Sequence, residues 1–218
     1  MANIMRDITR GYLKEQTRNA LKLLDVPKYD FTINKKEKFV WFRVPKVGTI
    51  SMRKQLECCG LASSNDTYYA KRYYPIKYRN YYKFAFVRNP WDRVVSCWIN
   101  KVIRKNAFKL DDDTYEAVKD FRGFVDYIEK LDVHTCDAHL RLQSELIDLN
   151  SVDYLARMES FERDVKNIIN IIGYDAEVVF HENRSNRVPY MEYYDAGLMK
   201  KIEAIYIRDI QLFGYSFQ

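Results

Sequence analysis

The apolar positions of the chain fall into short continuous runs and longer periodic segments. Three runs of strand type cover residues 39–44, 83–87 and 152–158. Runs that are apolar almost throughout are typical of strands buried on both faces of a parallel sheet. The first run carries one charge, Arg43, and Pro45 ends it.

The periodic segments between and around these runs predict helices. Apolar residues recur at spacings of three and four from Thr114 to Leu131 and from Ala196 to Phe213. Further helices are predicted at about Ile8–Leu24, from Ser51 as the N-cap, from Pro90, and from Phe161 to Ile172 with Gly173 at the end. Strands separated by helices predict an α/β fold with a central parallel sheet flanked by helices.

The turn after the first run has the features of an anion site. In Lys46-Val47-Gly48-Thr49-Ile50, Gly48 permits close backbone approach, and successive N–H groups before a helix can converge on a phosphate. It is not a Walker loop, because the lysine precedes the glycine. For one short motif, an ordinary strand-to-helix turn with a solvated lysine is the better interpretation.

A second turn of the same kind makes an anion site the better interpretation of both. After residues 83–87, Arg88 closes the strand, Pro90 suits the first turn of a helix, and Ser96 follows about two helical turns on. Arg88 and Ser96 could then share one anion. Both turns leave the carboxyl ends of parallel strands, where sheets of this type bind their ligands.

These two turns resemble those of the PAPS-dependent sulfotransferases, specifically the carbohydrate (family 2) branch. PKVGTISMRKQL is similar to the family's 5′-phosphosulfate loop, and FAFVRNPWDRVVSCW to its 3′-phosphate motif. Three later segments match in order: Cys136–His139 with Gln143, Ala156–Asp164, and Tyr193–Phe217, which ends in FGYSF. The resemblance runs from about Lys38 to the C-terminus, and it implies the single-domain, P-loop-like fold of that family.

The resemblance also implies a reaction and roles for individual residues. A sulfuryl group would pass from PAPS (3′-phosphoadenosine-5′-phosphosulfate) to an acceptor hydroxyl, with a carbohydrate or glycan as the expected acceptor and no metal. Lys46 would stabilise the charge that builds on the bridging oxygen of the leaving phosphate. The 5′-phosphate would be held by the N–H groups of Val47, Gly48, Thr49, Ile50 and Ser51 with the Thr49 and Ser51 hydroxyls, and the 3′-phosphate by Arg88 and Ser96. At the position of Ile50, the family that this chain resembles commonly has a hydroxyl residue.

The general base is less clearly marked. Many relatives place a histidine or glutamate between the two loops, but this interval holds no histidine and only Glu57 and Asp66 as acids. His139 lies in the third matching segment, four residues before Gln143, a spacing that would put both on one helical face. We therefore expect His139 to be the base, with Asp66 and then Glu57 as alternatives. The competing interpretation is that His139 only bonds a neighbouring loop.

Residues 67–83 combine seven tyrosines and five basic residues without an acid. Such a mixture suits stacking on sugars or bases while anionic groups are neutralised. An exposed loop followed by a half-buried helix, with the tyrosine rings packed, explains the stretch equally well.

Composition bears on the class of partner, on the number of domains and on the location of the protein. The net charge of +6 favours a polyanionic partner, such as a nucleotide, an acidic glycan or nucleic acid. We expect one domain over residues 1–218, of which 1–30 form an N-terminal helical extension. That extension carries charges throughout, so neither a signal peptide nor a membrane anchor is predicted, and a soluble, cytoplasmic, bacterial-type or viral member is expected. The four cysteines lack C-x-x-C spacing and are expected to be reduced.

Two other functions remain open at this point. A small-molecule kinase would use the same kind of site, and it predicts tight ATP binding and magnesium dependence. A non-catalytic binder of polyanions or single-stranded nucleic acid would use the aromatic and basic stretch from Tyr68 to Lys83, although nucleic acid is the less expected partner.

Overall fold

The sheet has parallel and antiparallel parts. The computed structural model describes residues 26–104, 106–175 and 187–218, and within them the chain forms a five-stranded sheet of order β3-β1-β2-β4-β5. The strands are β1 (Lys28–Asn34), β2 (Phe39–Phe42), β3 (Thr67–Arg72), β4 (Tyr82–Val87) and β5 (Tyr154–Arg157). β2, β4 and β5 run parallel, whereas β1 pairs antiparallel with both β2 and β3. The predicted α/β class is confirmed, but the sheet is mixed and not wholly parallel.

The three parallel strands are the three apolar runs of the sequence, while β1 and β3 were not predicted. β1 begins at Lys28, so residues 28–30 belong to the sheet and not to the N-terminal helical extension. The helix predicted at Ile8–Leu24 lies outside the described residues.

The helices occupy the connections between strands and the second half of the chain. The α-helices are α2 (Thr49–Cys58), α3 (Pro90–Trp98), α4 (Asp112–Val118), α5 (Phe121–Glu129), α6 (Phe161–Ile172), α7 (Ala196–Ile205) and α8 (Ile207–Phe213). A π-helical turn, η3 (Ile99–Ile103), continues α3, and short 3₁₀ turns include η2 (Pro75–Tyr78), η4 (Gln143–Glu145), η5 (Met158–Ser160) and η6 (Tyr190–Tyr193). The predictions of a helix from Pro90 and of a helix from Phe161 to Ile172, ended by Gly173, are confirmed.

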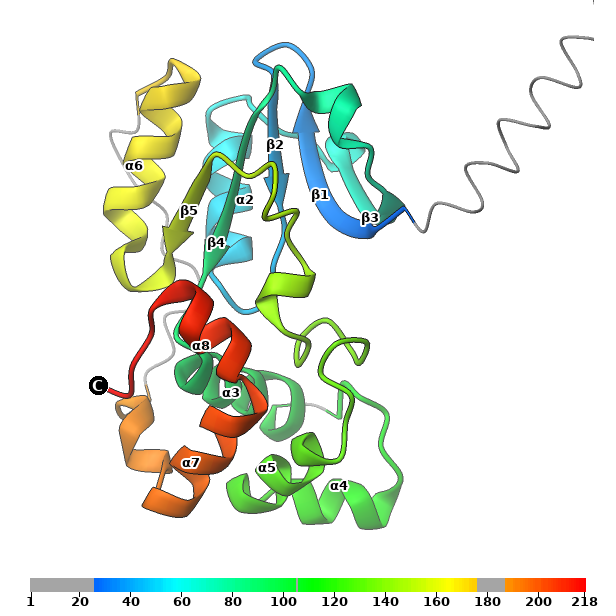
Figure 1. Cartoon of the computed structure of the whole chain (residues 1–218), viewed down its shortest axis with the longest axis vertical. Coiled ribbons are helices and arrows are strands. Elements are labelled where there is room, and N and C mark those ends of the chain that lie inside the picture. The colour runs from blue at the N-terminus through cyan, green and yellow to red at the C-terminus, as the bar shows by residue number, and fades with distance from the viewer. Residues whose placement is uncertain (1–25, 105, 176–186) are drawn as a thin grey trace, which may run out of the picture.

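The elements divide into a sheet layer and a helical layer. α2 and α6 lie beside the sheet, while α3, α4, α5, α7 and α8 gather beyond the carboxyl ends of β2 and β4 (Figure 1). Two buried apolar clusters match this division, one centred on the sheet and one on α3, α5 and α7. The carboxyl ends of the parallel strands therefore meet the helical layer.

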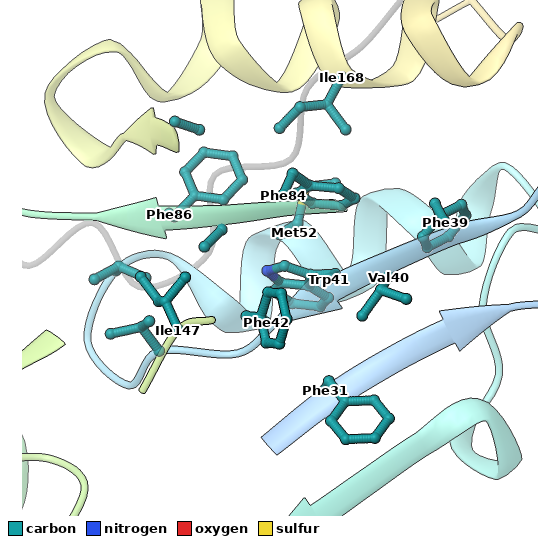
Figure 2. Close-up of a cluster of buried hydrophobic side chains, with 14 of the residues drawn as sticks. Phe31, Phe39, Val40, Trp41, Phe42, Met52, Phe84, Phe86, Ile147 and Ile168 are labelled. Atoms are coloured by element: carbon teal, nitrogen blue, oxygen red, sulfur yellow. The ribbon is translucent and has the colours of Figure 1, made fainter. Parts of the chain in front are cut away.

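Aromatic side chains fill the core around the central strands. Trp41 and Phe84, which are paired across β2 and β4, stack with ring centroids 6.2 Å apart and planes at 6° (Figure 2). Ile168 from α6 and Met52 from α2 are also completely buried in this cluster. Burial of each large apolar side chain contributes roughly 1.5–3 kcal/mol, so the ends of β2 and β4 are firmly positioned.

Two long helices predicted from periodicity are each broken once. The segment from Thr114 to Leu131 forms α4 and α5, because Asp120 caps a new helix by accepting the Gly123 N–H at 3.2 Å. A Cβ at Gly123 would lie 2.0 Å from the Ala117 carbonyl oxygen, so the junction is tight. The segment from Ala196 to Phe213 breaks at Tyr206, whose buried hydroxyl donates to the Leu140 carbonyl at 2.7 Å.

The tyrosine-rich stretch forms β3, η2 and the first residues of β4. The exposed loop and half-buried helix of the alternative interpretation are thus a strand and a short 3₁₀ turn, but the ring packing it expected is found for Tyr73 and Tyr78, which are buried and stacked with centroids 5.3 Å apart. All four cysteines are free thiols. In the described ranges, no helix has the length and apolar character needed to cross a membrane.

Candidate active site

The turn between β2 and α2 bends sharply at two residues. Lys46 and Gly48 have left-handed backbone conformations, with φ of 72° and 82°. A Cβ at Gly48 would come within 2.8 Å of the Phe161 ring and 2.9 Å of the Met158 sulfur, so only glycine fits between this turn and α6. The first N–H groups of α2 have no partners within the helix, as at any helix N-terminus, and this end adjoins the cavity described below.

The structure modifies two expectations for this turn. Gly48, not Ser51, is the N-cap residue of α2, so the helix begins about one turn earlier than predicted and Ser51 is buried within its first turn. The Thr49 hydroxyl donates to the Val44 carbonyl at 2.6 Å, so only its lone pairs remain for another group. Ile50 is exposed, and it can offer an anion only its N–H.

Arg88, which follows β4 directly, is oriented by two neighbours. Its Nε and Nη2 donate to Asp92 Oδ2 at 2.8 and 2.7 Å, and its Nη1 donates to the Lys46 carbonyl at 3.0 Å. A guanidinium has five N–H donors, so two of them remain for a ligand. Asp92 also accepts from Arg187, and this carboxylate therefore links two arginines.

The backbone of the Arg88–Asn89 turn is held by three segments that are distant in sequence. Gln143 is completely buried, and its side-chain amide accepts from the Arg88 N–H and donates to the Arg88 carbonyl, both at 2.9 Å. Glu159 accepts from the Asn89 N–H at 2.7 Å, and Asn89 Nδ2 donates to the Ser216 carbonyl at 2.9 Å. Gln143, Glu159 and Ser216 each belong to one of the three later segments that the sequence analysis matched. All three segments therefore support the Arg88–Asn89 turn.

The backbone at Gln143 is in turn positioned by Asp209. Asp209 is completely buried and accepts the N–H groups of Gln143 and Ser144 at 2.6 and 3.0 Å. Gln143 belongs to a short 3₁₀ turn, and His139 precedes that turn, so the prediction that both lie on one helical face is wrong.

Buried Arg93 of α3 joins the two turns to the segment that carries His139. Its Nε donates to the Pro45 carbonyl at 3.2 Å, while its terminal nitrogens donate to the carbonyls of Arg141 and Ala138 at 2.8 and 2.9 Å. One side chain therefore sets the positions of Lys46 and His139 relative to each other, although the two residues are far apart in sequence.

A cavity of about 360 Å³ brings most of the predicted site residues together. Its lining includes Lys46, Gly48, Thr49, Ile50, Arg88, Ser96 and His139. A larger hollow of about 690 Å³ begins at the same Arg88, Ser96 and Met158 and continues to Glu159, Arg187 and Tyr190. The two hollows thus adjoin at Arg88, Ser96 and Met158, and together they are called the cleft below.

The cleft is strongly positive beside Lys46. Burial, opposed by Cys97 and assisted by Arg88, Lys101 and Arg104, lowers the pKa of Lys46 from 10.5 to about 8. The ammonium form is the protonated one, so Lys46 remains mainly charged at pH 7 and loses its charge as the pH rises through 8. A bound anion would favour the charged form and raise this pKa again.

His139 forms a pair with an ionised aspartate. Its Nδ1 lies 2.7 Å from Asp137 Oδ1, which also accepts the His139 N–H at 2.9 Å, and these bonds lower the pKa of Asp137 to about 2. Because the carboxylate can only accept, Nδ1 carries a proton, and in the neutral imidazole Nε2 then has the lone pair. The pair therefore has the arrangement of an oriented general base.

The two alternative acids lie elsewhere. Glu57 forms an ion pair with Arg53 on α2, and Asp66 accepts from the N–H and hydroxyl of Ser63; neither is among the residues that line the cavity. Sequence reasoning missed Asp30 of β1, which does line it. The alternating pattern of β1 could have placed Asp30 on a sheet face, but not beside Lys46.

Comparison with known proteins identifies the family. The model of the sulfotransferase family matches residues 29–216, which is most of the chain, and the chain belongs to this family, family 2. Comparison with curated proteins and with solved structures gave no match. The mixed sheet and its flanking helices are therefore those of an α/β sulfotransferase, and family membership supports sulfuryl transfer as the reaction. Among the described residues, no group of three or more His, Cys, Asp or Glu could hold a metal ion.

Replacement of Gln143 by alanine tests the support of the Arg88 turn. Gln143→Ala leaves the part-buried N–H and C=O of Arg88 without their partner, each at a cost of about 1–3 kcal/mol, so the free energy of unfolding should fall by roughly 2–6 kcal/mol. Urea denaturation measures this change. The exposed Gln211→Ala on α8 should change it by less than about 0.5 kcal/mol. Equal stability of the two variants would contradict the supporting role.

Proposed function

We propose that the chain is a PAPS-dependent sulfotransferase that transfers a sulfuryl group to a hydroxyl of a carbohydrate. The observation that supports this most is that Lys46, Arg88 and Ser96 line the same cavity. A nucleotide with phosphates on both its 5′ and 3′ sides needs two anion sites next to each other. The charge of the cleft and the two remaining donors of Arg88 suit that requirement.

The proposed binding mode follows the two halves of the cleft. The N–H groups of residues 47–51 and the Lys46 ammonium hold the 5′-phosphosulfate, while Arg88 and Ser96 hold the 3′-phosphate. The adenine then lies in the larger hollow, where Tyr190 and Phe161 supply aromatic surface. The acceptor hydroxyl enters the smaller cavity beside His139.

In the proposed reaction, His139 Nε2 takes the proton of the acceptor hydroxyl as its oxygen bonds to sulfur. The bond between sulfur and the bridging oxygen of the 5′-phosphate breaks, and its electron pair stays on that oxygen. Lys46 stabilises the resulting charge, and adenosine 3′,5′-bisphosphate is the second product. Asp137 holds the imidazole in the tautomer that can accept the proton.

The alternative function, which involves a different reaction, is that of a small-molecule kinase. Such an enzyme would bind ATP with magnesium in the same cleft. The lysine of this turn precedes the glycine, and the chain lacks the Walker arrangement in which a lysine reaches the β- and γ-phosphates.

Arg88→Ala tests the 3′-phosphate site. Loss of a charge-assisted, forked contact should weaken binding of adenosine 3′,5′-bisphosphate by roughly 2 kcal/mol or more, as measured by calorimetry. Arg79→Ala removes the same charge from an exposed position outside the cleft and should leave the affinity almost unchanged. If the folded Arg88→Ala protein binds the bisphosphate as tightly as the wild type, the nucleotide assignment loses its main support.

Lys46→Ala separates chemistry from binding. It should lower kcat by roughly 10²–10³-fold, because it removes charge from the leaving oxygen, and weaken bisphosphate binding much less. In the wild type, kcat/KM for PAPS should decline above about pH 8, where free Lys46 loses its proton. Lys46→Arg should move that decline to higher pH without fully restoring kcat. A preserved kcat with a large loss of affinity would show that Lys46 only anchors phosphate.

His139→Ala tests the base. We expect kcat to fall by roughly 10²-fold or more, with bisphosphate affinity unchanged, because general-base catalysis is lost. His134→Ala, an exposed histidine of the same segment, is the matched control and should retain full turnover. A folded His139→Ala enzyme with near-normal kcat would limit His139 to a structural role and leave Asp30 as the carboxylate in the cavity.

A further inference from the structure

The helix that follows the Arg88–Asn89 turn changes its form beside the smaller cavity. α3 continues into the π-helical turn η3, in which the Arg104 N–H donates to the Ile99 carbonyl, five residues earlier, at 3.1 Å. Single turns of this kind are rare, and they occur frequently at functional sites. Here η3 forms part of the cavity wall, because Asn100 and Lys101 both line the cavity.

Contacts with the helical layer hold η3 in place. The Val102 carbonyl accepts the Tyr115 hydroxyl of α4 at 3.2 Å, and the Lys101 carbonyl accepts the Ala107 N–H at 2.9 Å. Carbonyl groups at the end of a helix have no partner within it, and these two bonds supply one to each. Val102 is also buried in the apolar cluster of the helical layer. The backbone that carries Lys101 is therefore anchored on the side away from the cavity.

The π-helical turn brings Lys101 toward the side of the helix that carries Ser96. In an uninterrupted α-helix, a residue five positions after Ser96 would lie about 140° further around the axis. A π-helical turn contains more residues and reduces that angle. Ser96 and Lys101 accordingly line the same cavity.

The Lys101 ammonium is available to a ligand. Within residues 26–104, 106–175 and 187–218, its side chain forms no hydrogen bond, and no carboxylate lies within ion-pair distance of it. Lys119 and Lys201, by contrast, each form an ion pair with an acid. The Lys101 side chain is half-buried in the cavity wall, so its three N–H donors can reach a group bound there.

Lys101 lies close to two groups of the proposed mechanism. Its charge contributes to the lowered pKa of Lys46 and to the lowered pKa of Asp137, the partner of His139. Such effects decline with distance, so Lys101 is near both ends of the reaction path. Lys101 shares the smaller cavity with Lys46 and His139, and it does not line the larger hollow.

The proposed reaction leaves one set of charged atoms without a cation. Lys46 acts on the bridging oxygen, and Arg88 with Ser96 holds the 3′-phosphate. The sulfuryl group itself passes from the side of Lys46 to the side of His139, and its three terminal oxygens carry negative charge. In the comparable transfer of a phosphoryl group, charge is spread over the three equatorial oxygens in the transition state, where cations stabilise it.

We propose that Lys101 binds a terminal oxygen of the sulfuryl group of PAPS and is a second cation of the catalytic site. The contact holds the sulfur between the bridging oxygen and the acceptor hydroxyl, and it is kept while the group is transferred. The bonds that form and break are those of the proposed reaction, and Lys101 neither gains nor loses a proton. This inference rests on the proposed function, and it adds a residue that recognises the transferred group.

A comparison of two nucleotides isolates this contact, because adenosine 3′,5′-bisphosphate lacks the sulfuryl group that PAPS carries. Calorimetry without an acceptor measures the Kd of each nucleotide for the wild type and for Lys101→Gln. The affinity of Lys101→Gln for PAPS should fall roughly tenfold or more, because a charge-assisted hydrogen bond is lost. Its affinity for the bisphosphate should stay almost unchanged. The two nucleotides have nearly the same net charge, so loss of a general attraction would weaken both equally.

Arg104→Gln is the matched control. Arg104 ends the same turn, is exposed and also contributes to the lowered pKa of Lys46, but it does not line the cavity. This variant should leave the ratio of the two affinities as it is in the wild type. An unchanged ratio in Lys101→Gln, or an equal change of the ratio in Arg104→Gln, would overturn the inference.

The proposed function and the role of Lys101 fail differently in this experiment. If the wild type does not bind both nucleotides, the proposed function is wrong. If it binds both and Lys101→Gln weakens them equally, the proposed function stands and the contact with the sulfuryl group is wrong. The melting temperature of each variant, measured alongside, shows that a lost affinity does not come from unfolding.

Discussion

The site depends above all on the hydrogen bonds that fix the Arg88–Asn89 turn. A turn at the end of a buried strand exposes N–H and C=O groups that the sheet no longer pairs, and each would be costly to leave unpaired. Here Gln143, Glu159 and Ser216 supply the missing partners from three distant parts of the chain. The C-terminal half of the molecule thus serves to hold one turn in a single conformation, with Arg88 directed into the cleft.

The turn from Lys46 to Ile50 is coupled to the Arg88–Asn89 turn by direct contact. Arg88 donates to the Lys46 carbonyl, and Arg93 reaches from α3 to Pro45 and to the segment before His139. Gly48 completes the junction, because any side chain there would collide with α6. A binding site of this kind is organised before its ligand arrives, which reduces the entropy lost on binding and keeps the reacting groups in place.

The sequence predicted the parts of the fold that are encoded locally. The continuous apolar runs identified β2, β4 and β5, and the two turns after β2 and β4 identified Lys46 and Arg88. β1 was missed although Tyr29, Phe31 and Ile33 alternate with polar residues, because residues 28–30 were assigned to a helical extension and residues 31–34 to no element. The placement of Asp30 in the cavity requires the antiparallel pairing of β1 with β2 and β3, and such long-range pairing leaves no local signal.

The central claim is that the cleft binds a nucleotide through phosphates on both sides of its ribose. Calorimetry with the wild-type protein tests it directly, with adenosine 3′,5′-bisphosphate, adenosine 5′-monophosphate and ATP with magnesium as ligands. A forked contact from Arg88 to the 3′-phosphate is worth roughly 2 kcal/mol, so the bisphosphate should bind about 30-fold more tightly than the monophosphate, and without metal. Equal affinity for these two nucleotides, or tighter binding of ATP with magnesium, would contradict the account.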